Sequence, residues 1–118
     1  MKKIAISLLL IFAFFICLPI AQSDETPGQK IFMAQKCNTC HSIETQQIAK
    51  TMKTVPSSMA KNPPPDLSNI GADKTAEWIT KFLKKEETLN KQKHPKTWAG
   101  KDDELKTLVD WLATLKKA

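Results

Sequence analysis

The residues with the clearest chemistry are two cysteines and a histidine in the segment 37–41. Two residues separate the thiols, and the imidazole of His41 follows the second thiol directly. Thiols at this spacing can add to the two vinyl groups of one haem, whose iron the adjacent imidazole can then reach. The pattern Cys-x-x-Cys-His is typical of c-type haem attachment. We expect Cys37 and Cys40 to form the thioether bonds and His41 to be the proximal iron ligand.

Two other kinds of site also use a Cys-x-x-Cys pair. A thioredoxin-like dithiol lies beside a βαβ pattern, which this sequence does not show. A structural zinc site needs four ligands, but no cysteine follows Cys40 and His94 is the only other histidine. The long gap to His94 lacks zinc-finger spacing. Both alternatives stay open, but haem attachment is the one that explains a histidine directly after Cys40.

The first 23 residues have the pattern of a secretory signal peptide. Two lysines precede an apolar run over residues 4–20, and smaller residues follow at positions 21–23. We expect cleavage after Ser23 and export of a mature domain, residues 24–118, to the periplasm. The alternative is an uncut membrane anchor, because the apolar run is long enough to span a bilayer.

The third cysteine, Cys17, lies inside this first segment. Bulky residues at positions 14–16 directly precede it, where a lipoprotein signal has small residues. We therefore disfavour a lipid anchor. Removal of the segment leaves two cysteines, both used by haem, so we expect no disulfide in the mature chain.

The charge of the chain is basic, with a formal net charge of +6. Loss of Lys2 and Lys3 with the signal leaves about +4, and every basic residue is a lysine. Nucleic-acid sites usually combine arginine with aromatic residues, so we expect no nucleic-acid binding. We interpret the lysines as a surface for redox protein partners with acidic docking faces.

The spacing of apolar residues predicts an all-α domain with three main helices and no strand. A short helix is expected over residues 28–36, with Phe32 in the core. Residues 42–65 form an irregular wrapping loop, with a short helical piece over 46–53. A second helix is expected from Thr75 to about residue 85, with Asp73 as its N-cap.

The last helix has the strongest pattern. Asp102 and Asp103 lie in its first turn and Lys116 and Lys117 at its end, as the helix dipole favours. Trp111 flanks its apolar stripe. That stripe consists of Leu105, Leu108, Val109, Leu112 and Leu115.

The mature domain resembles the class I (mitochondrial-type) monohaem cytochromes c of bacteria. The resemblance rests on Gly28-x-x-x-Phe32 ahead of the haem motif, on residues 65–71 followed by Trp78-Ile79, and on Leu108-x-x-Trp111-Leu112. It implies a small cytochrome c fold around one covalent haem c. It also implies that the last helix crosses the first near the glycine and the aromatic residue.

The second axial ligand departs from this resemblance, which implies a methionine in the loop before the last helix. That loop, residues 86–100, contains no methionine but does contain His94. Pro95 turns His94 away from helical backbone angles, as a loop ligand requires. We expect His94 to be the distal ligand. Met59 and Met52 are alternatives, and a lysine ligand or an open site also stays possible.

These residues predict a one-electron carrier rather than an enzyme, because no acid–base pair, activated nucleophile or phosphate loop accompanies the haem motif. A second imidazole gives a lower potential than a thioether. We expect no small-molecule substrate, and membrane contact only if the first segment stays uncut. The alternative functions are a haem-based gas or redox sensor with a displaceable distal ligand and, third, a non-redox metal-binding module.

Overall fold

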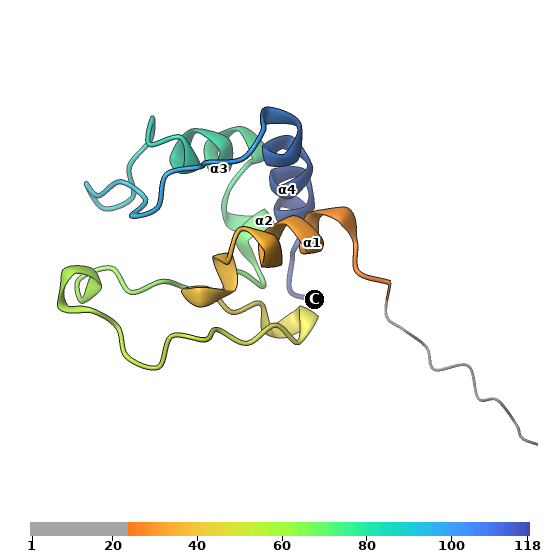
Figure 1. The fold of residues 1–118 in the computed structure, drawn as a ribbon. Helices are drawn as coiled ribbons and strands as arrows, with labels where there is room; N and C mark the ends of the chain where they lie inside the picture. The colour runs from red at the N-terminus through yellow and green to blue at the C-terminus, as the bar shows by residue number, and fades with distance from the viewer. Residues whose placement is uncertain (1–23) are drawn as a thin grey trace, which may run out of the picture.

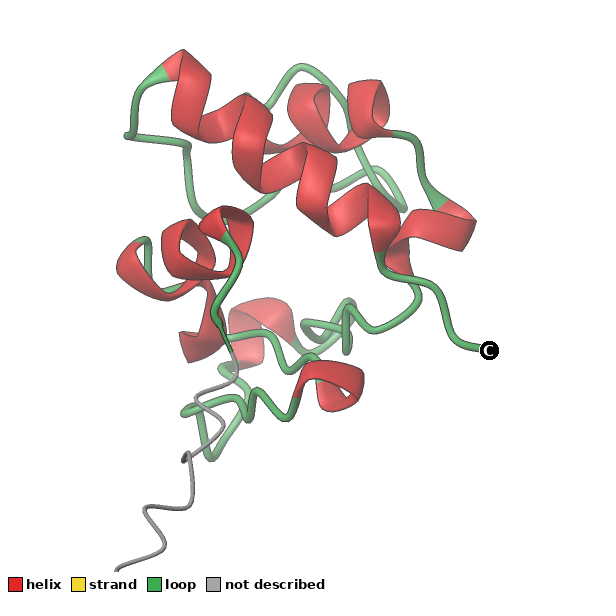
Figure 2. Cartoon of the chain, turned by 90° about the vertical axis from the view of Figure 1, so that its right-hand side faces the viewer, coloured by secondary structure: helices red, strands yellow, loops and turns green. Residues whose placement is uncertain are grey.

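The structure is a computed structural model that describes residues 24–118. The predicted signal segment, residues 1–23, lies outside the described residues. Short helices and long loops make up the domain (Figures 1 and 2). The α-helices are α1 (Pro27–Ala34), α2 (Ile70–Asp73), α3 (Ala76–Leu83) and α4 (Asp102–Thr114). Single 3-10 turns cover Cys37–Thr39, Glu44–Gln46 and Ser57–Met59.

The described residues confirm the predicted all-α class. Between residues 24 and 118 the extended backbone pairs only in two isolated bridges, Ile43 with Ile48 and Leu89 with Gln92. In the same part of the chain, no helix combines the length and the apolar character needed to cross a membrane.

The core forms where α1 crosses α4 (Figure 1). Pro27 opens α1, a position where its missing N–H costs nothing, and the hydroxyl of Thr26 accepts the N–H of Gln29 at 3.3 Å. Phe32 is buried on α4, with its ring centre 5.8 Å from that of Trp111 in an edge-to-face arrangement. This packing confirms the helix crossing that the resemblance implies.

Helix α4 buries the predicted stripe. Leu105, Leu108, Val109, Leu112 and Leu115 are each at most 5% exposed. The helix ends at Thr114, so the two lysines expected at its end follow the helix instead of lying in its last turn.

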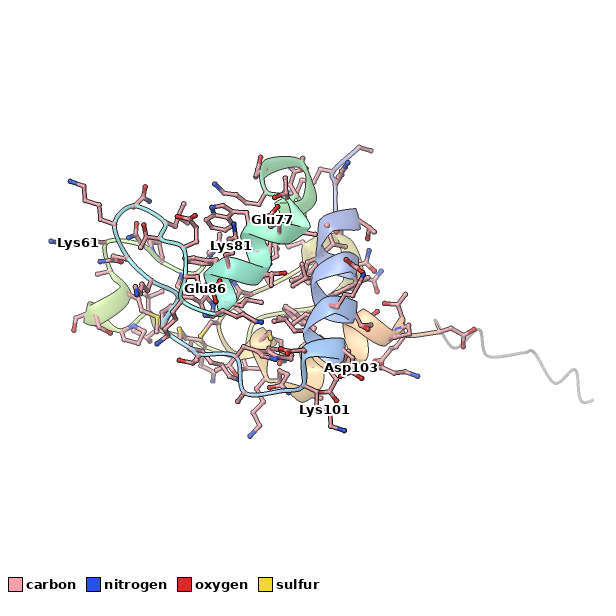
Figure 3. The ribbon with its side chains drawn as sticks, turned by 90° about the horizontal axis from the view of Figure 1, so that it is seen from above. Lys61, Glu77, Lys81, Glu86, Lys101 and Asp103 are labelled. Carbon is pink, nitrogen blue, oxygen red and sulfur yellow. The ribbon has the colours of Figure 1, made fainter. Side chains whose placement is uncertain are left out.

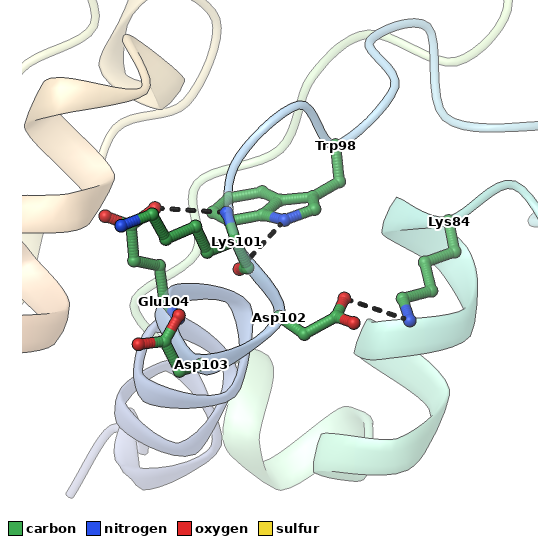
Figure 4. Close-up of polar contacts among 6 residues, drawn as sticks. All are labelled: Lys84, Trp98, Lys101, Asp102, Asp103 and Glu104. Atoms are coloured by element: carbon green, nitrogen blue, oxygen red, sulfur yellow. Dashed lines mark hydrogen bonds and ion pairs between the residues drawn. The ribbon is translucent and has the colours of Figure 1, made fainter.

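Polar contacts fix the start of α4 (Figure 4). The N–H of Lys101 donates to the carboxylate of Glu104 at 3.2 Å, and the indole N–H of Trp98 donates to the carbonyl of Lys101 at 3.3 Å. Asp102 lies 3.5 Å from the ammonium of Lys84, next to α3. These contacts fix the loop to the first turn of α4 and link that turn to Lys84, the residue that follows α3.

The predicted capping of the second helix is wrong. Asp73 is the last residue of α2, and Thr75 caps α3 by accepting the N–H of Trp78 at 3.2 Å. The helix also ends sooner than residue 85. Lys85 has a left-handed backbone, φ 61°, and the N–H groups of Lys85 and Glu86 donate back to the last turn, which closes the helix.

The outer face of α3 is charged. Glu77 and Lys81 form an exposed ion pair of 2.8 Å one turn apart (Figure 3).

The wrapping loop has less helix than predicted. The helical piece predicted over residues 46–53 does not form. One 3-10 turn ends at Gln46, and Gln47 then adopts a left-handed backbone, φ 56°, which stops the helix.

Candidate functional site

A cavity of about 470 Å³ lies between the helices and the wrapping loop, a size typical of cofactor sites. Its wall is mainly apolar. Side chains from every helix contribute, namely Phe32 of α1, Ile70 of α2, Trp78, Ile79, Phe82 and Leu83 of α3, and Leu108 and Leu112 of α4. The apolar residues of α3 therefore form part of the cavity wall.

Cys37 and Cys40 lie at the cavity wall on one 3-10 turn. Lys36 adopts a left-handed backbone, φ 57°, which ends α1 and starts the turn. The N–H groups of Cys40 and His41 both donate to the carbonyl of Cys37, at 3.2 and 3.0 Å. Both thiols are free. Burial raises the pKa of the Cys37 thiol, and the positive charge of the nearby Lys96 partly offsets this rise. The turn brings both thiols and the following imidazole to one side of the cavity.

His41 has one ring nitrogen held by the backbone. Its Nδ1 lies 2.8 Å from the carbonyl oxygen of Pro65, which can only accept a hydrogen bond. The proton is therefore on Nδ1, and Nε2 keeps a free lone pair. Burial lowers the pKa of His41, although the Pro65 contact opposes the shift. The ring is thus neutral at pH 7 and ready to bind a metal.

His94 lines the same cavity and repeats this arrangement. Its Nδ1 lies 2.6 Å from the carbonyl oxygen of Lys96, so its Nε2 is also the free nitrogen. The rings of His41 and His94 are nearly parallel, at 15°, with centres 6.2 Å apart. The edge of Phe82 packs against His94 with 5.4 Å between ring centres.

Only some of the other candidate iron ligands line the cavity. Met59 lines the cavity, whereas Met52 does not, and the backbone N–H of Met52 donates to the carbonyl of Thr39. Lys93 and Lys96 line it as well. Among residues 24–118, no three Cys, His, Asp or Glu side chains gather closely enough to hold a metal ion.

Sequence reasoning missed the residue that supports the proximal side. The carboxylate of Asp66 accepts hydrogen bonds from the Ser42 hydroxyl at 2.8 Å, the Ser68 N–H at 2.9 Å and the Glu44 N–H at 3.0 Å. Burial opposes ionisation, but these bonds outweigh it and lower the pKa of Asp66 to about 2. The network fixes the backbone beside Pro65. An aspartate directly after three prolines was the available signal.

The residues present fit a haem. Each metal–imidazole bond is about 2 Å long, and each ring centre lies about 1 Å behind its nitrogen, so two imidazoles on one metal have centres about 6 Å apart. The observed 6.2 Å agrees with this value. The free thiols of Cys37 and Cys40 could form the thioethers, and the apolar wall could enclose the ring.

The family comparison agrees with this fit. The chain matches the family model for Cytochrome c over residues 25–116. Comparisons with curated proteins and with solved structures found no match. The family binds haem c covalently and carries electrons through it, and Cys37 and Cys40 fit its attachment motif. The chain belongs to the cytochrome c family, as a class I monohaem member.

Proposed function

We propose that this cytochrome is an exported one-electron carrier whose haem iron is held between His41 and His94. The observation that carries the proposal is the pair of nearly parallel imidazoles at one cavity, with 6.2 Å between ring centres and each Nδ1 bound to a backbone carbonyl. The haem supplies an iron that changes between the ferrous and ferric states. Cys37 and Cys40 hold it through thioether bonds.

Two imidazoles suit a carrier rather than an enzyme. An imidazole nitrogen is a strong iron ligand, and two of them leave no coordination position for a substrate. Carbonyl partners on both Nδ1 atoms raise the basicity of the ligands and fix the orientation of the rings. A second imidazole in place of a thioether also favours a lower potential. Outer-sphere transfer of one electron is the chemistry that this arrangement supports.

An optical spectrum of the holoprotein tests the ligand. We expect His94→Ala to convert a low-spin haem into a high-spin or CO-binding one, because the second axial nitrogen is lost. Met59→Leu, the control inside the same cavity, and Met52→Leu should leave the spectrum unchanged. A far-red charge-transfer band in the oxidised unaltered protein, which marks sulfur ligation, would contradict His94 and make Met59 the first candidate. Rapid CO binding by the unaltered protein would favour the sensor alternative.

The charge around the cavity supports partners with acidic docking faces. Four lysines are among the residues that line it, and within the described residues no carboxylate joins them. These lysines are Lys36, Lys74, Lys93 and Lys96. A positive field near the haem would speed encounter with a negative surface and orient it for electron transfer.

Export of the mature domain, residues 24–118, remains a proposal from the sequence. Two lysines, an apolar run and smaller residues at positions 21–23 support cleavage after Ser23. N-terminal sequencing of the protein isolated from the periplasm is expected to read from Asp24. A protein that starts at Met1 and stays with the membrane would establish the anchor alternative instead.

A further inference from the structure

The loop that carries His94 begins with a tight turn over residues 89–92. The N–H of Leu89 donates to the carbonyl of Gln92 at 2.8 Å, and the N–H of Gln92 donates back at 2.9 Å. The two central residues, Asn90 and Lys91, have φ of 51° and 65°. Two positive φ values in a two-residue turn are the type I′ geometry of a hairpin. The turn is therefore a defined unit, and one residue, Lys93, separates it from His94.

A single side chain from the wrapping loop holds this turn. Nδ2 of Asn62 donates to Oε1 of Gln92 at 2.6 Å, and Oδ1 of Asn62 accepts from Nδ2 of Asn90 at 3.0 Å. An amide is suited to this because it presents donors and an acceptor at once. Within residues 24–118, no other hydrogen bond connects residues 87–93 to another segment.

The other end of the loop is held more firmly. The ammonium of Lys96 donates to the carbonyl of Gln35, beside the haem motif. The backbone N–H of Trp98 donates to the carbonyl of Leu83 at 3.2 Å. The loop thus has a fixed end after His94 and an end before it that depends on Asn62.

We infer that Asn62 is a positioning residue for His94, and that its two hydrogen bonds set how often the loop lifts and frees the second axial position. The inference rests on the proposed function, in which His94 binds the iron. Asn62, Leu89 and Gln92 line the same cavity as His94, so the contact is part of the wall that His94 also forms. Local opening of a loop costs least where few contacts hold it, and here one amide supplies them.

The test measures CO binding to the reduced holoprotein as a function of CO concentration. CO can bind ferrous iron only after His94 has left it. At high CO concentration the observed rate of CO binding therefore reaches a limit set by departure of the imidazole, which takes its Nε2 lone pair with it. We expect Asn62→Leu to keep the low-spin spectrum and to raise this limiting rate about five- to tenfold, because two exposed hydrogen bonds of modest strength are lost. Gln92→Leu removes one of the two bonds and should give a smaller rise.

The matched control is Asn69→Leu. The Oδ1 of Asn69 accepts the N–H of Lys117 at 2.8 Å, in a contact that does not involve the His94 loop. Limiting rates that are the same in Asn62→Leu, Gln92→Leu and the unaltered protein would overturn the role of Asn62 and leave the His94 assignment intact. An equal rise in Asn69→Leu would also overturn it, since the effect would then be general loosening. A His94→Ala spectrum identical to that of the unaltered protein would instead overturn the ligand, and this inference with it.

Discussion

Gly28 lies so close to Trp111 that a β-carbon at residue 28 would be 2.2 Å from the β-carbon of the tryptophan. Real atoms do not approach so closely, so the crossing of α1 and α4 depends on a missing side chain. The position of α1 matters for function because the helix leads into the turn that carries Cys37 and Cys40.

We therefore expect Gly28→Ala to destabilise the holoprotein by about 1–3 kcal/mol, because overpacking forces two helices apart. Urea unfolding followed by circular dichroism measures the change. Lys30→Ala, an exposed site on the same helix, is the control and should stay close to the unaltered protein. Equal stability of the two variants would mean that the helices can separate without cost.

Local patterns predicted the helices well where one face meets the core. The predicted stripe was correct because Leu105, Leu108, Val109 and Leu112 follow the helix period in α4, and Leu115, directly after the helix, is buried with them. The predicted capping of α3 was wrong because Thr75, two residues after Asp73, caps the helix. Asp73 instead ends α2, a helix of four residues that is too short to show a period, and the N–H of Gly71 in α2 donates at 2.9 Å to the carbonyl of Leu115, which is distant in sequence.

The candidate site likewise has a part that the sequence predicts and a part that it does not. The motif at Cys37 and Cys40 is local, so the sequence alone identified it. The partners of the ligands are not local, because Pro65 lies 24 residues after His41 and Asn62 lies 30 residues before Gln92. No periodicity encodes which carbonyl or amide a loop places beside an imidazole. The choice of His94 came from the absence of methionine in its loop, not from any contact.

The carboxylate of Asp66 should make the protein sensitive to acid. Its folded-state pKa of about 2 lies below the ordinary value of 3.8, so it contributes stability above about pH 4 and loses that contribution as pH falls toward 2. The shift corresponds to about 2 kcal/mol. We expect Asp66→Asn to lower the free energy of unfolding at pH 7 and to approach the unaltered protein near pH 2.

Urea unfolding at several pH values provides the measurement for Asp66. Asp24→Asn, at an exposed position near the start of the described residues, is the control. A difference between Asp66→Asn and the unaltered protein that stays constant from pH 7 to pH 2 would show that the ionised carboxylate is not the source of the stability.

If the haem is attached covalently, its mass should stay with the protein when non-covalent haem is extracted. Protein made together with a haem-attachment system should carry the mass of one haem, and acid–acetone, which removes non-covalent haem, should leave it in place. The double variant Cys37→Ala/Cys40→Ala should lose that mass entirely. Each single variant should retain one thioether, with a shifted optical spectrum. Release of the haem from the unaltered protein by acid–acetone would refute attachment at this motif.

The lysines at the cavity predict a salt dependence whose sign follows the charge of the partner. Oxidation of the reduced protein by anionic ferricyanide should slow as salt rises, because the attraction is screened beyond about 10 Å at 0.1 M. Oxidation by a cationic cobalt complex should accelerate, because the repulsion is screened instead. Rates that stay constant with both oxidants would contradict a positive field at the site of electron transfer.

Charge-reversal variants at two surface positions test where that positive field lies. Lys93 lines the cavity, whereas Lys106 lies on another face of α4, in a groove beside α3. At low salt, Lys93→Glu should slow the ferricyanide reaction several-fold and weaken its salt dependence, since charges near the contact change the rate of encounter. Lys106→Glu makes the same change in net charge and should have a much smaller effect. If the two variants slow the reaction equally, the net charge of the protein guides the encounter, and the lysines at the cavity have no special role.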